Sequence, residues 1–446
     1  MVKPAPKPVS RPDDAGWLTR IRLFRNDMFS SQPDRLYRAW MAEMRGPFYR
    51  SFLVNDPALV RRILIESPDN FPKSAIIHDT LRGLLGESVF VTNGEVWKRQ
   101  RRIIDPAFEG SAKSGFPAML AASKDAVARL TEGEVEVEYE ASYLAADIIF
   151  RTLFSIPISS DIAARTFTAF RTYQRAQPLW NIPGLLRLPR WVPRFPARPA
   201  RDSAAEIRQL LTELVAARAA EIAAGTAPDD LATRIMTTAD PETGACFSTA
   251  EMVDQVAIFF LAGHETSASA LAWGLFLLAD NPDIQDRVVA EVSALPTNPT
   301  FSDFSRLPFT RDVFREVLRL FPPVPMMVRE AAKATELRDR NVPRGSLAIL
   351  SPWHLHRHER LWDRPDEFDP DRWQNDATQT SKREAYIPFS AGPRVCTGAG
   401  FAMAEGVLML AMMVRAFRFE ATETPIPVAH LTVRAKNGIR LKVLRR

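Results

Sequence analysis

A mainly α-helical fold with a minor β-sheet is what the amino-acid sequence of this 446-residue chain predicts. Long stretches of strong helix formers with helical apolar spacing dominate, and strand-like runs are short and few. We find no interior stretch with the composition of a linker. We therefore expect one large domain over residues 35–446, preceded by a proline-rich, partly flexible segment at residues 1–34.

The longest expected helix starts at a capping box formed by Ser248 and Glu251 and stops at the Asp-Asn-Pro sequence of residues 280–282. Apolar spacing and high helix propensity indicate further helices at 201–224, 309–321 and 401–417. Short strands are expected at 47–54, 345–351 and 438–444.

The composition is that of an ordinary globular protein, because 46% of the residues are hydrophobic and 25% are charged. The longest apolar runs, such as residues 256–263, fall far short of the roughly 18 residues that a membrane span needs. The start of the chain has no apolar signal-peptide core, and two cysteines are too few for a disulfide-built secreted protein. We therefore expect a cytoplasmic protein without a membrane span.

The net charge of +5 includes no basic block longer than residues 98–102. Nucleic-acid binding is therefore not expected, and a local basic patch for an acidic protein partner is the better interpretation.

Cys396, one of the two cysteines, lies in Phe-Ser-Ala-Gly-Pro-Arg-Val-Cys-Thr-Gly at residues 389–398. Most buried cysteines are inert, but this one precedes an expected helix, whose positive dipole end lowers the pKa of a thiol. Gly392 and Gly398 permit a tight backbone around a sulfur or a bulky ligand, and Arg394 adds a positive charge. Two cysteines cannot supply a four-cysteine zinc or iron–sulfur site. The pattern favours one thiolate as axial ligand to a metal held in a cofactor.

Midway along the longest helix the sequence reads Ala-Gly-His-Glu-Thr at residues 262–266. A glycine inside a helix costs about 1 kcal/mol relative to alanine. Ala262, Gly263 and Thr266 share one helical face, which would allow a flat ligand to approach closely beside a hydroxyl. Taken alone, the segment is more simply explained by a buried threonine bonded to the carbonyl four residues earlier.

Two charged motifs have simple explanations when each is taken alone. Glu316 and Arg319 are spaced i, i+3 on an expected helix, and such pairs are usually exposed and weak. Trp97 and Arg101 are one helical turn apart, so both could point at one anion, but an isolated segment of this kind is usually a solvated basic face.

Together, these motifs resemble those of the cytochrome P-450 (haem-thiolate monooxygenase) superfamily, soluble bacterial type. Residues 389–398 match F-x-x-G-x-R-x-C-x-G at every fixed position, and residues 262–266 match A-G-x-[ED]-T. The resemblance extends from about residue 35 to the end of the chain. It implies the cytochrome P-450 fold, with haem b (iron protoporphyrin IX) between the long central helix and the loop that carries the cysteine ligand.

The resemblance also implies site residues. Cys396 would be the proximal ligand of the haem iron, an electron-rich thiolate that favours O–O cleavage. Thr266 would steady dioxygen, Glu265 would assist proton delivery, and His264 would be structural or solvent-facing. The other cofactor-binding residues would be Phe389, Gly392, Arg394, Gly398, Trp97, Arg101, Arg329, Ala262 and Gly263. Glu316 and Arg319 would join Arg372 in a structural ion-pair network behind the haem.

The implied reaction is insertion of one oxygen atom of O2 into a lipophilic small molecule, by hydroxylation of a fatty-acid-like, terpenoid, steroid or alkane C–H bond. Electrons would come from a separate ferredoxin and ferredoxin reductase, because no flavin or ferredoxin segment follows the haem domain. An acidic ferredoxin would be steered to Lys98, Arg99 and Arg102.

An apolar pocket is expected to select the substrate by shape and burial. Its expected lining is Phe259, Phe260, Pro325, Met326, Met327 and Leu431. The stretch 177–199, rich in proline, tryptophan and arginine, is a candidate lid. Arginines at 187, 190, 194 and 198 favour a fatty acid, with a neutral terpenoid, steroid or alkane as the alternative.

Two alternative functions are also compatible with the sequence. His354, His356 and His358 have strand spacing, which could place three imidazoles on one side for zinc in a metal-dependent hydrolase. Arg357 and Arg360 would oppose a cation there, so we interpret these histidines as structural. A non-catalytic haem-thiolate sensor is the second alternative, but it would not need Glu265 and Thr266.

Overall fold

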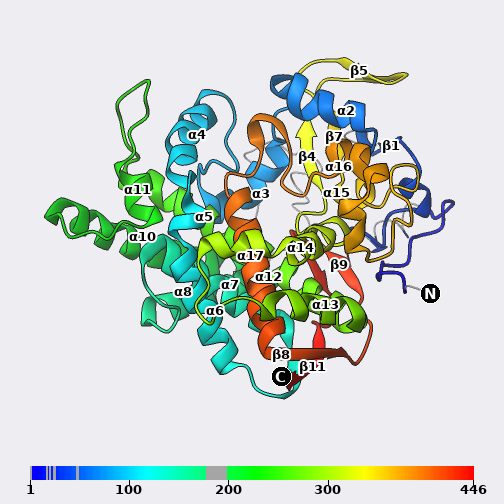
Figure 1. The fold of residues 1–446 in the computed structure, drawn as a ribbon. Helices are drawn as coiled ribbons and strands as arrows, with labels where there is room; N and C mark the ends of the chain where they lie inside the picture. Colours follow the sequence, from blue (N-terminus) through cyan, green and yellow to red (C-terminus); the bar gives the residue numbers. More distant parts are fainter. Residues whose placement is uncertain (1–2, 17–18, 20–21, 24–26, 47–49, 177–197) are drawn as a thin grey trace. The chain divides into compact units, whose positions relative to one another are not determined.

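The computed structural model describes residues 3–16, 19, 22–23, 27–46, 50–176 and 198–446 (Figure 1). The chain divides into two compact units, and the single domain over residues 35–446 stays a prediction. Unit 1 contains residues 1–71, 123–142 and 266–446, and unit 2 contains residues 72–122 and 143–265. The fold is mainly helical with small sheets, as the sequence predicts.

Unit 2 is helical. Its helices are α3 (Ala75–Leu85), α4 (Gly94–Phe108), α5 (Ser111–Ser114), α8 (Asp161–Ala176), α10 (Arg198–Ala224) and α11 (Leu231–Thr237). Three further helices run from one unit into the other along the chain: α6 (Phe116–Arg129), α7 (Val137–Phe154) and α12 (Thr249–Asp280).

The start of α12 is the expected capping box. The backbone N of Glu251 donates to Ser248 Oγ at 3.3 Å, and the backbone N of Ser248 donates to Glu251 Oε2 at 2.8 Å. These two bonds satisfy donors that the first turn of a helix otherwise leaves unpaired.

Unit 1 holds the sheets. The four-stranded sheet has the order β1 (Met41–Arg45), β2 (Arg50–Val54), β7 (Leu347–Leu350), β4 (Met327–Glu330), in which β2 and β7 are parallel. The three-stranded sheet has the order β3 (Gly133–Glu136), β11 (Arg440–Arg445), β8 (Phe417–Ala421). Two hairpins pair β5 (Thr335–Leu337) with β6 (Arg340–Val342) and β9 (Pro427–Ala429) with β10 (Val433–Ala435).

The other helices of unit 1 are α2 (Pro57–Arg61), α13 (Pro282–Ser293), α14 (Pro308–Leu320), α15 (Pro352–Leu355), α16 (Gln379–Ala385) and α17 (Ala399–Ala416). A π-helical turn at Arg62–Glu66 follows α2. Short 3-10 turns occur at Asp34–Tyr37, Pro68–Asn70, Phe301–Arg306, Pro370–Gln374, Asp376–Thr378 and Gly392–Arg394.

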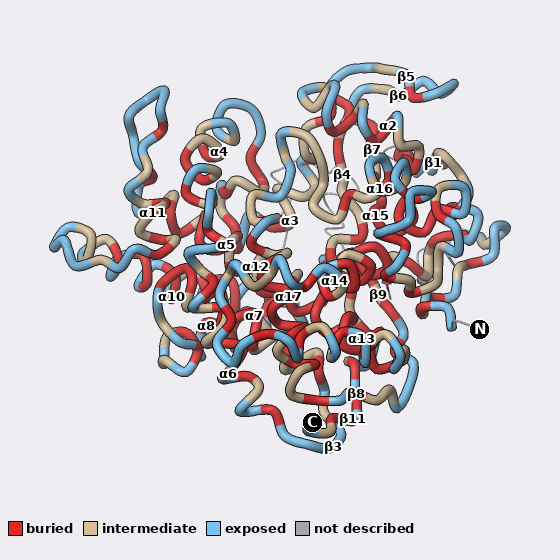
Figure 2. Tube along the Cα trace, viewed as in Figure 1, coloured by how far each residue is buried: buried red, intermediate tan, exposed pale blue. Residues whose placement is uncertain are grey.

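The core of unit 1 is built on α14 and α17, which are mostly buried (Figure 2). A Cβ atom at Gly406 of α17 would lie 1.9 Å from the Phe314 ring of α14, so this crossing requires glycine. In the described part of the chain, α17 is the one helix long and apolar enough to cross a membrane. However, 61% of its apolar window is buried inside the protein, as in a core helix.

The described start of the chain packs against the rest of unit 1. The backbone N of Ala5 donates to the carbonyl of Asp366 at 2.7 Å, and Lys7 Nζ lies 2.8 Å from the Asp366 carboxylate. These contacts hold the described start of the chain on the surface of this unit.

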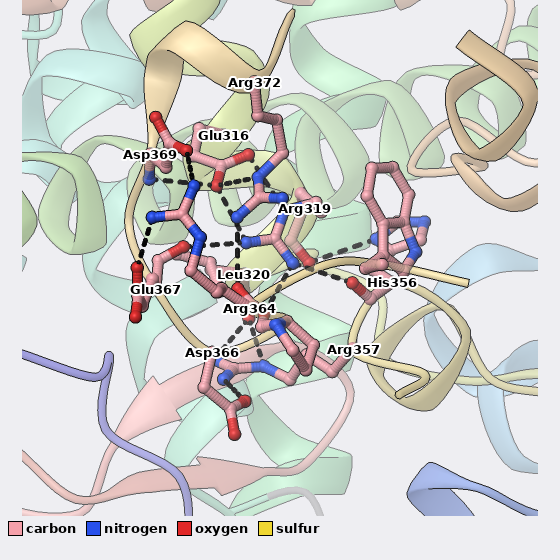
Figure 3. A network of polar contacts seen from close by, with 12 residues as sticks. Glu316, Arg319, Leu320, His356, Arg357, Arg364, Asp366, Glu367, Asp369 and Arg372 are labelled. Atoms are coloured by element: carbon pink, nitrogen blue, oxygen red, sulfur yellow. Dashed lines mark hydrogen bonds and ion pairs between the residues drawn. The ribbon is translucent and has the colours of Figure 1, made fainter. Parts of the chain in front are cut away.

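Glu316, Arg319 and Arg372 form the buried ion-pair network that the resemblance implies (Figure 3). Arg319 contacts both Glu316 oxygens, at 2.8 and 2.9 Å, and Arg372 Nε contacts Oε1 at 3.0 Å. The indole of Trp373 donates to Oε2 at 3.1 Å. Burial alone would raise the pKa of Glu316, but Arg319 and Arg372 hold it below its ordinary value. This carboxylate therefore fixes α14 to the loop that leads towards Cys396.

We predict that Glu316→Gln lowers the free energy of unfolding by about 3–5 kcal/mol, because it leaves two buried guanidinium groups without their countercharge. The matched control is Asp371→Asn, one residue before Arg372. Its pair with Arg287, at 2.7 Å, is about half exposed, so the loss should stay below about 1 kcal/mol. Equal losses in thermal or denaturant unfolding would contradict a stabilising role for the buried network.

Candidate active site

The cysteine loop, residues 389–398, presents a thiol at the start of α17. The backbone N of Cys396 donates to the carbonyl of Phe389 at 2.9 Å, which closes the loop. Ser390 and Gly392 have φ values of 63° and 70°, so the chain turns through two left-handed positions. The side chain of Cys396 is exposed, although cysteine is among the residue types most often buried. A fixed, accessible thiol beside a helix N-terminus is suited to ligate a metal.

Gly392 holds the loop against the π-helical turn at Arg62–Glu66. A Cβ atom at Gly392 would lie 2.1 Å from the carbonyl oxygen of Leu64 and 3.2 Å from the Cα of Ile65. Both neighbours are backbone, which cannot rotate away. The sequence predicts a permissive glycine here, but no local pattern identifies the turn that it packs against.

The central segment of α12 has two faces in unit 2. Ala262 is exposed, but a Cβ atom at Gly263 would lie 2.4 Å from Cδ1 of Ile149 in α7. The sequence suggested that Gly263 lets a flat ligand approach α12. In the structure, the glycine instead permits the close approach of α7. His264 is buried against the Phe167 ring, with ring centroids 5.6 Å apart, and is structural.

Glu265 is buried in unit 2, and its Oε2 accepts a hydrogen bond from Gln174 Nε2 of α8 at 3.1 Å. This contact holds the carboxyl group in place. The sequence motif identifies Glu265, but it does not identify Gln174, which lies 91 residues earlier.

In unit 1, α12 continues with a half-buried Thr266 and a buried Ser267. The hydroxyl of Ser267 donates to Glu405 of α17. Two residues further, Ser269 Oγ donates to the carbonyl of Val433 at 2.6 Å. These contacts connect α12 to the helix that follows Cys396 and to the C-terminal hairpin. No sequence motif identifies Ser267 or Glu405, although Glu405 is the one acid in the apolar helix α17.

The basic residues of α4 have acidic partners within unit 2. Arg99 contacts Glu251 at 2.6 Å and Arg102 contacts Asp240 at 2.6 Å. Lys98 pairs with Glu95 at 2.8 Å, and Arg101 pairs with Asp105 at 2.8 Å. The segment around Trp97 is therefore largely charge-compensated and is not an isolated basic patch.

Arg329 of β4 is a buried cation that needs an anion. The residue is 5% exposed, and burial lowers its pKa to about 10. Among the described residues no aspartate or glutamate pairs with it, and its hydrogen bond to the carbonyl of Val328 is long, at 3.5 Å. A buried guanidinium is stable only with a countercharge. The exposed Cys396 thiol and this guanidinium, both in unit 1, fit an anionic metal cofactor such as haem.

The residues expected to line the pocket differ in how far they are exposed. Phe260 is fully buried between Phe150 and Phe170, with ring centroids 4.2 and 5.2 Å away, so it has no exposed face in this structure. Phe259 is partly exposed and contacts Phe108 at 5.3 Å.

The residues of unit 1 that the sequence analysis expects to line a pocket are in or just before β4 and in the C-terminal hairpin. Met326 and Met327 are partly exposed, and Leu431, between β9 and β10, is 38% exposed. Pro325 is buried, and its carbonyl accepts from Ser351 Oγ at 3.1 Å. The candidate lid lies outside the described residues, apart from residues 198 and 199.

The three histidines are structural, which excludes the zinc-hydrolase alternative for the described residues. His354 lies on α15 and not on a strand, so the side chains do not alternate. Its Nδ1 contacts Ser351 Oγ at 2.8 Å, His356 accepts from the backbone N of Ile387 at 2.9 Å, and His358 stacks on Trp40. Burial lowers their pKa values to about 3, 3 and 4, so all three are neutral. No cluster of potential metal ligands occurs in the described ranges.

Comparison with known proteins identifies the family of the chain. A family model described as cytochrome P-450 matches residues 26–443, so the chain belongs to the cytochrome P-450 family. Cyclooctat-9-en-7-ol 5-monooxygenase of Streptomyces melanosporofaciens is 33% identical, covering 87% of this chain and 83% of the relative. Pentalenene oxygenase of Streptomyces avermitilis is 30% identical, with 87% of each chain covered.

A more distant relative is taurochenodeoxycholic 6 alpha-hydroxylase of Sus scrofa, which is 28% identical, covering 88% of this chain and 81% of the relative. The crystal structure of the cytochrome P-450DA heme domain superposes with a TM-score of 0.80 at 24% identity, covering 100% of this chain and 98% of that one. The fold is thus the one that the sequence predicts. The protein is a monooxygenase, and its family implies haem iron.

We predict that Gly392→Ala destabilises the cysteine loop by about 1–3 kcal/mol, because the new methyl group would enforce strain at positive φ and would overlap the Leu64 carbonyl. Haem retention and thermal midpoint measure the effect. Gly400→Ala is the control, because nothing lies within 4 Å of a Cβ atom there. If both variants retain haem equally, the Gly392 contact does not fix the loop.

We predict opposite effects of Arg329→Met on the two forms of the protein. The haem-free form should be as stable as wild type or more stable, because a buried unpaired charge is removed. Haem affinity should fall at least about tenfold, because a charged hydrogen bond is lost. Arg340→Met, at a half-exposed position on β6, should change neither quantity. Unchanged haem affinity in Arg329→Met would exclude Arg329 as an anion ligand.

Proposed function

We propose that this protein binds haem b through the Cys396 thiolate and hydroxylates a neutral lipophilic molecule. The observation that carries the proposal is the exposed Cys396 thiol at the start of α17, in the same unit as the buried Arg329, which lacks an acidic partner among the described residues. Arg329 would bind a propionate, as would Arg394 in the cysteine loop. Trp97 and Arg101, in unit 2, are the further candidates that the resemblance implies.

The bound haem supplies the activation of O2, and the residues of the chain supply position and protons. Glu265, held by Gln174, is the proposed source of protons. Thr266 is the proposed hydroxyl that orients dioxygen, and its half-buried position on α12 leaves it accessible. An acid and a hydroxyl are groups suited to general acid catalysis.

Electrons are proposed to arrive from a separate ferredoxin and its reductase. Because Arg99 and Arg102 are paired with acids, steering by Lys98, Arg99 and Arg102 would be weaker than the sequence suggests. We also propose that the protein is cytoplasmic, since the apolar helix α17 is largely buried in the fold.

A neutral substrate is favoured over a fatty acid. The preference for an acid rested on the arginines of the candidate lid, of which the structure describes Arg198. Its side chain is 85% exposed and lies 3.9 Å from Asp202, so it is a solvated charge. The expected pocket residues that are partly exposed, Phe259 in unit 2 and Met326, Met327 and Leu431 in unit 1, are all apolar. The relatives named for pentalenene and for cyclooctat-9-en-7-ol support a terpenoid-like molecule.

We predict that Thr266→Ala binds substrate as wild type does but diverts several times more of the consumed NAD(P)H to hydrogen peroxide, because proton delivery is disturbed. Peroxide and product are measured with a surrogate ferredoxin system. Ser269→Ala, on the same helix, is the control and should stay coupled. A fully coupled Thr266→Ala enzyme would rule out this role for Thr266.

The substrate class is tested by optical titration of the ferric protein. Terpenes and terpene alcohols should shift the iron towards high spin at concentrations at least about tenfold lower than fatty acids of similar size, because charge is costly in an apolar pocket. Tighter binding of the carboxylates than of matched alcohols would overturn the neutral-substrate proposal.

A further inference from the structure

Glu405 is a buried carboxyl group that none of the roles above uses. It lies in the interior of α17, nine residues after Cys396, and is 1% exposed. Its Oε2 accepts a hydrogen bond from Ser267 Oγ of α12, the residue directly after Thr266. Its Oε1 has no hydrogen-bond partner among the described residues. One hydrogen bond therefore joins the helix of the cysteine loop to the helix of the proposed oxygen-activating residue, within unit 1.

The surroundings of Glu405 differ from those of Glu316. No cation pairs with Glu405 among the described residues, and burial raises its pKa to about 8, which the hydrogen bond from Ser267 only partly offsets. The charged groups of the neighbouring helices do not contribute to this shift. In unit 1 they are Asp280 on α12, Asp283, Asp286, Arg287 and Glu291 on α13, Arg311, Asp312, Arg315, Glu316 and Arg319 on α14, and Arg415 on α17.

We propose that Glu405 is a positioning residue that, as an uncharged carboxylic acid, holds Ser267 and thereby sets Thr266 relative to the helix that begins at the cysteine loop. The inference rests on the proposed role of Thr266. An uncharged acid can sit in an apolar helix contact without a countercharge, whereas a carboxylate cannot. A single polar contact between otherwise apolar helix surfaces fixes their register, because sliding either helix leaves both groups unpaired.

The proposal has a defined pH dependence. The folded protein binds the Glu405 proton more tightly than the unfolded chain, whose glutamate has a pKa near 4.5. The stability that this proton contributes is therefore fully present below pH 4.5 and is lost as the pH rises through about 8. Glu405→Gln removes this titration and keeps a neutral side chain of the same shape.

The first experiment measures protonation without turnover. Infrared spectra of the haem-loaded wild type and Glu405→Gln are compared at neutral pH in the carbonyl-stretch region of protonated carboxylic acids. We expect a band in the wild type that is absent from the variant and that disappears as the pH rises through about 8. The thermal midpoint of wild type should fall relative to that of Glu405→Gln between pH 4.5 and about 8. Without the band, Glu405 is ionised and the proposal fails.

The second experiment separates positioning from simple stabilisation. Ser267→Ala and Ser269→Ala each remove one buried hydroxyl from α12, but only the first contacts Glu405. Ser267→Ala should raise the peroxide fraction several-fold, as Thr266→Ala does, and Ser269→Ala should not. Glu405→Gln should keep NAD(P)H consumption coupled to product formation, whereas the shorter Glu405→Asp should not.

Equal coupling in Ser267→Ala and Ser269→Ala would leave Glu405 a merely structural acid and overturn the proposal. If Thr266→Ala itself is fully coupled, the role of Thr266 fails, and the infrared band still reports independently on the state of Glu405.

Discussion

The proposed function depends on one constraint, which is that the backbone fixes the Cys396 thiol in an exposed position. The loop that does this is closed by the hydrogen bond from Cys396 N to Phe389 O and is pressed against the Leu64 carbonyl through Gly392. Backbone on both sides of this contact leaves no side chain that could adjust. The exposed cysteine is therefore a product of the fold, and α17 begins where the loop ends.

Three buried ionisable residues in unit 1 differ in how the free-energy cost of burying a charge is offset or avoided. Glu316 remains charged because Arg319 and Arg372 contact it directly. Glu405, with only a hydroxyl beside it, keeps its proton. Arg329 stays a guanidinium with a depressed pKa, and it is the one of the three whose surroundings call for a further group. Glu316 stabilises the fold, Glu405 is proposed to fix α17 relative to α12, and Arg329 is proposed to contact the cofactor.

The sequence predicts the helices and the motifs well because their information is local. The capping box of α12 appears as predicted, and α14 and α17 begin within two residues of the predicted starts at 309 and 401. Prediction from the sequence fails for contacts between segments that are distant along the chain. Arg99 meets Glu251, 152 residues away, and Phe260 packs into an aromatic core, and neither contact leaves a local pattern. The histidine spacing suggested a strand, but Ser351 and Pro352 start a helical turn there.

The most direct test of the account is the optical spectrum of the reduced carbon monoxide complex. Cys246, the other cysteine, is also exposed and serves as the matched control. Wild type and Cys246→Ser should both show the red-shifted Soret band of a thiolate ligand. Cys396→Ser should lose that band while keeping its helical far-ultraviolet spectrum. Haem-loaded Cys396→Ser protein that retains the band would contradict thiolate ligation by Cys396.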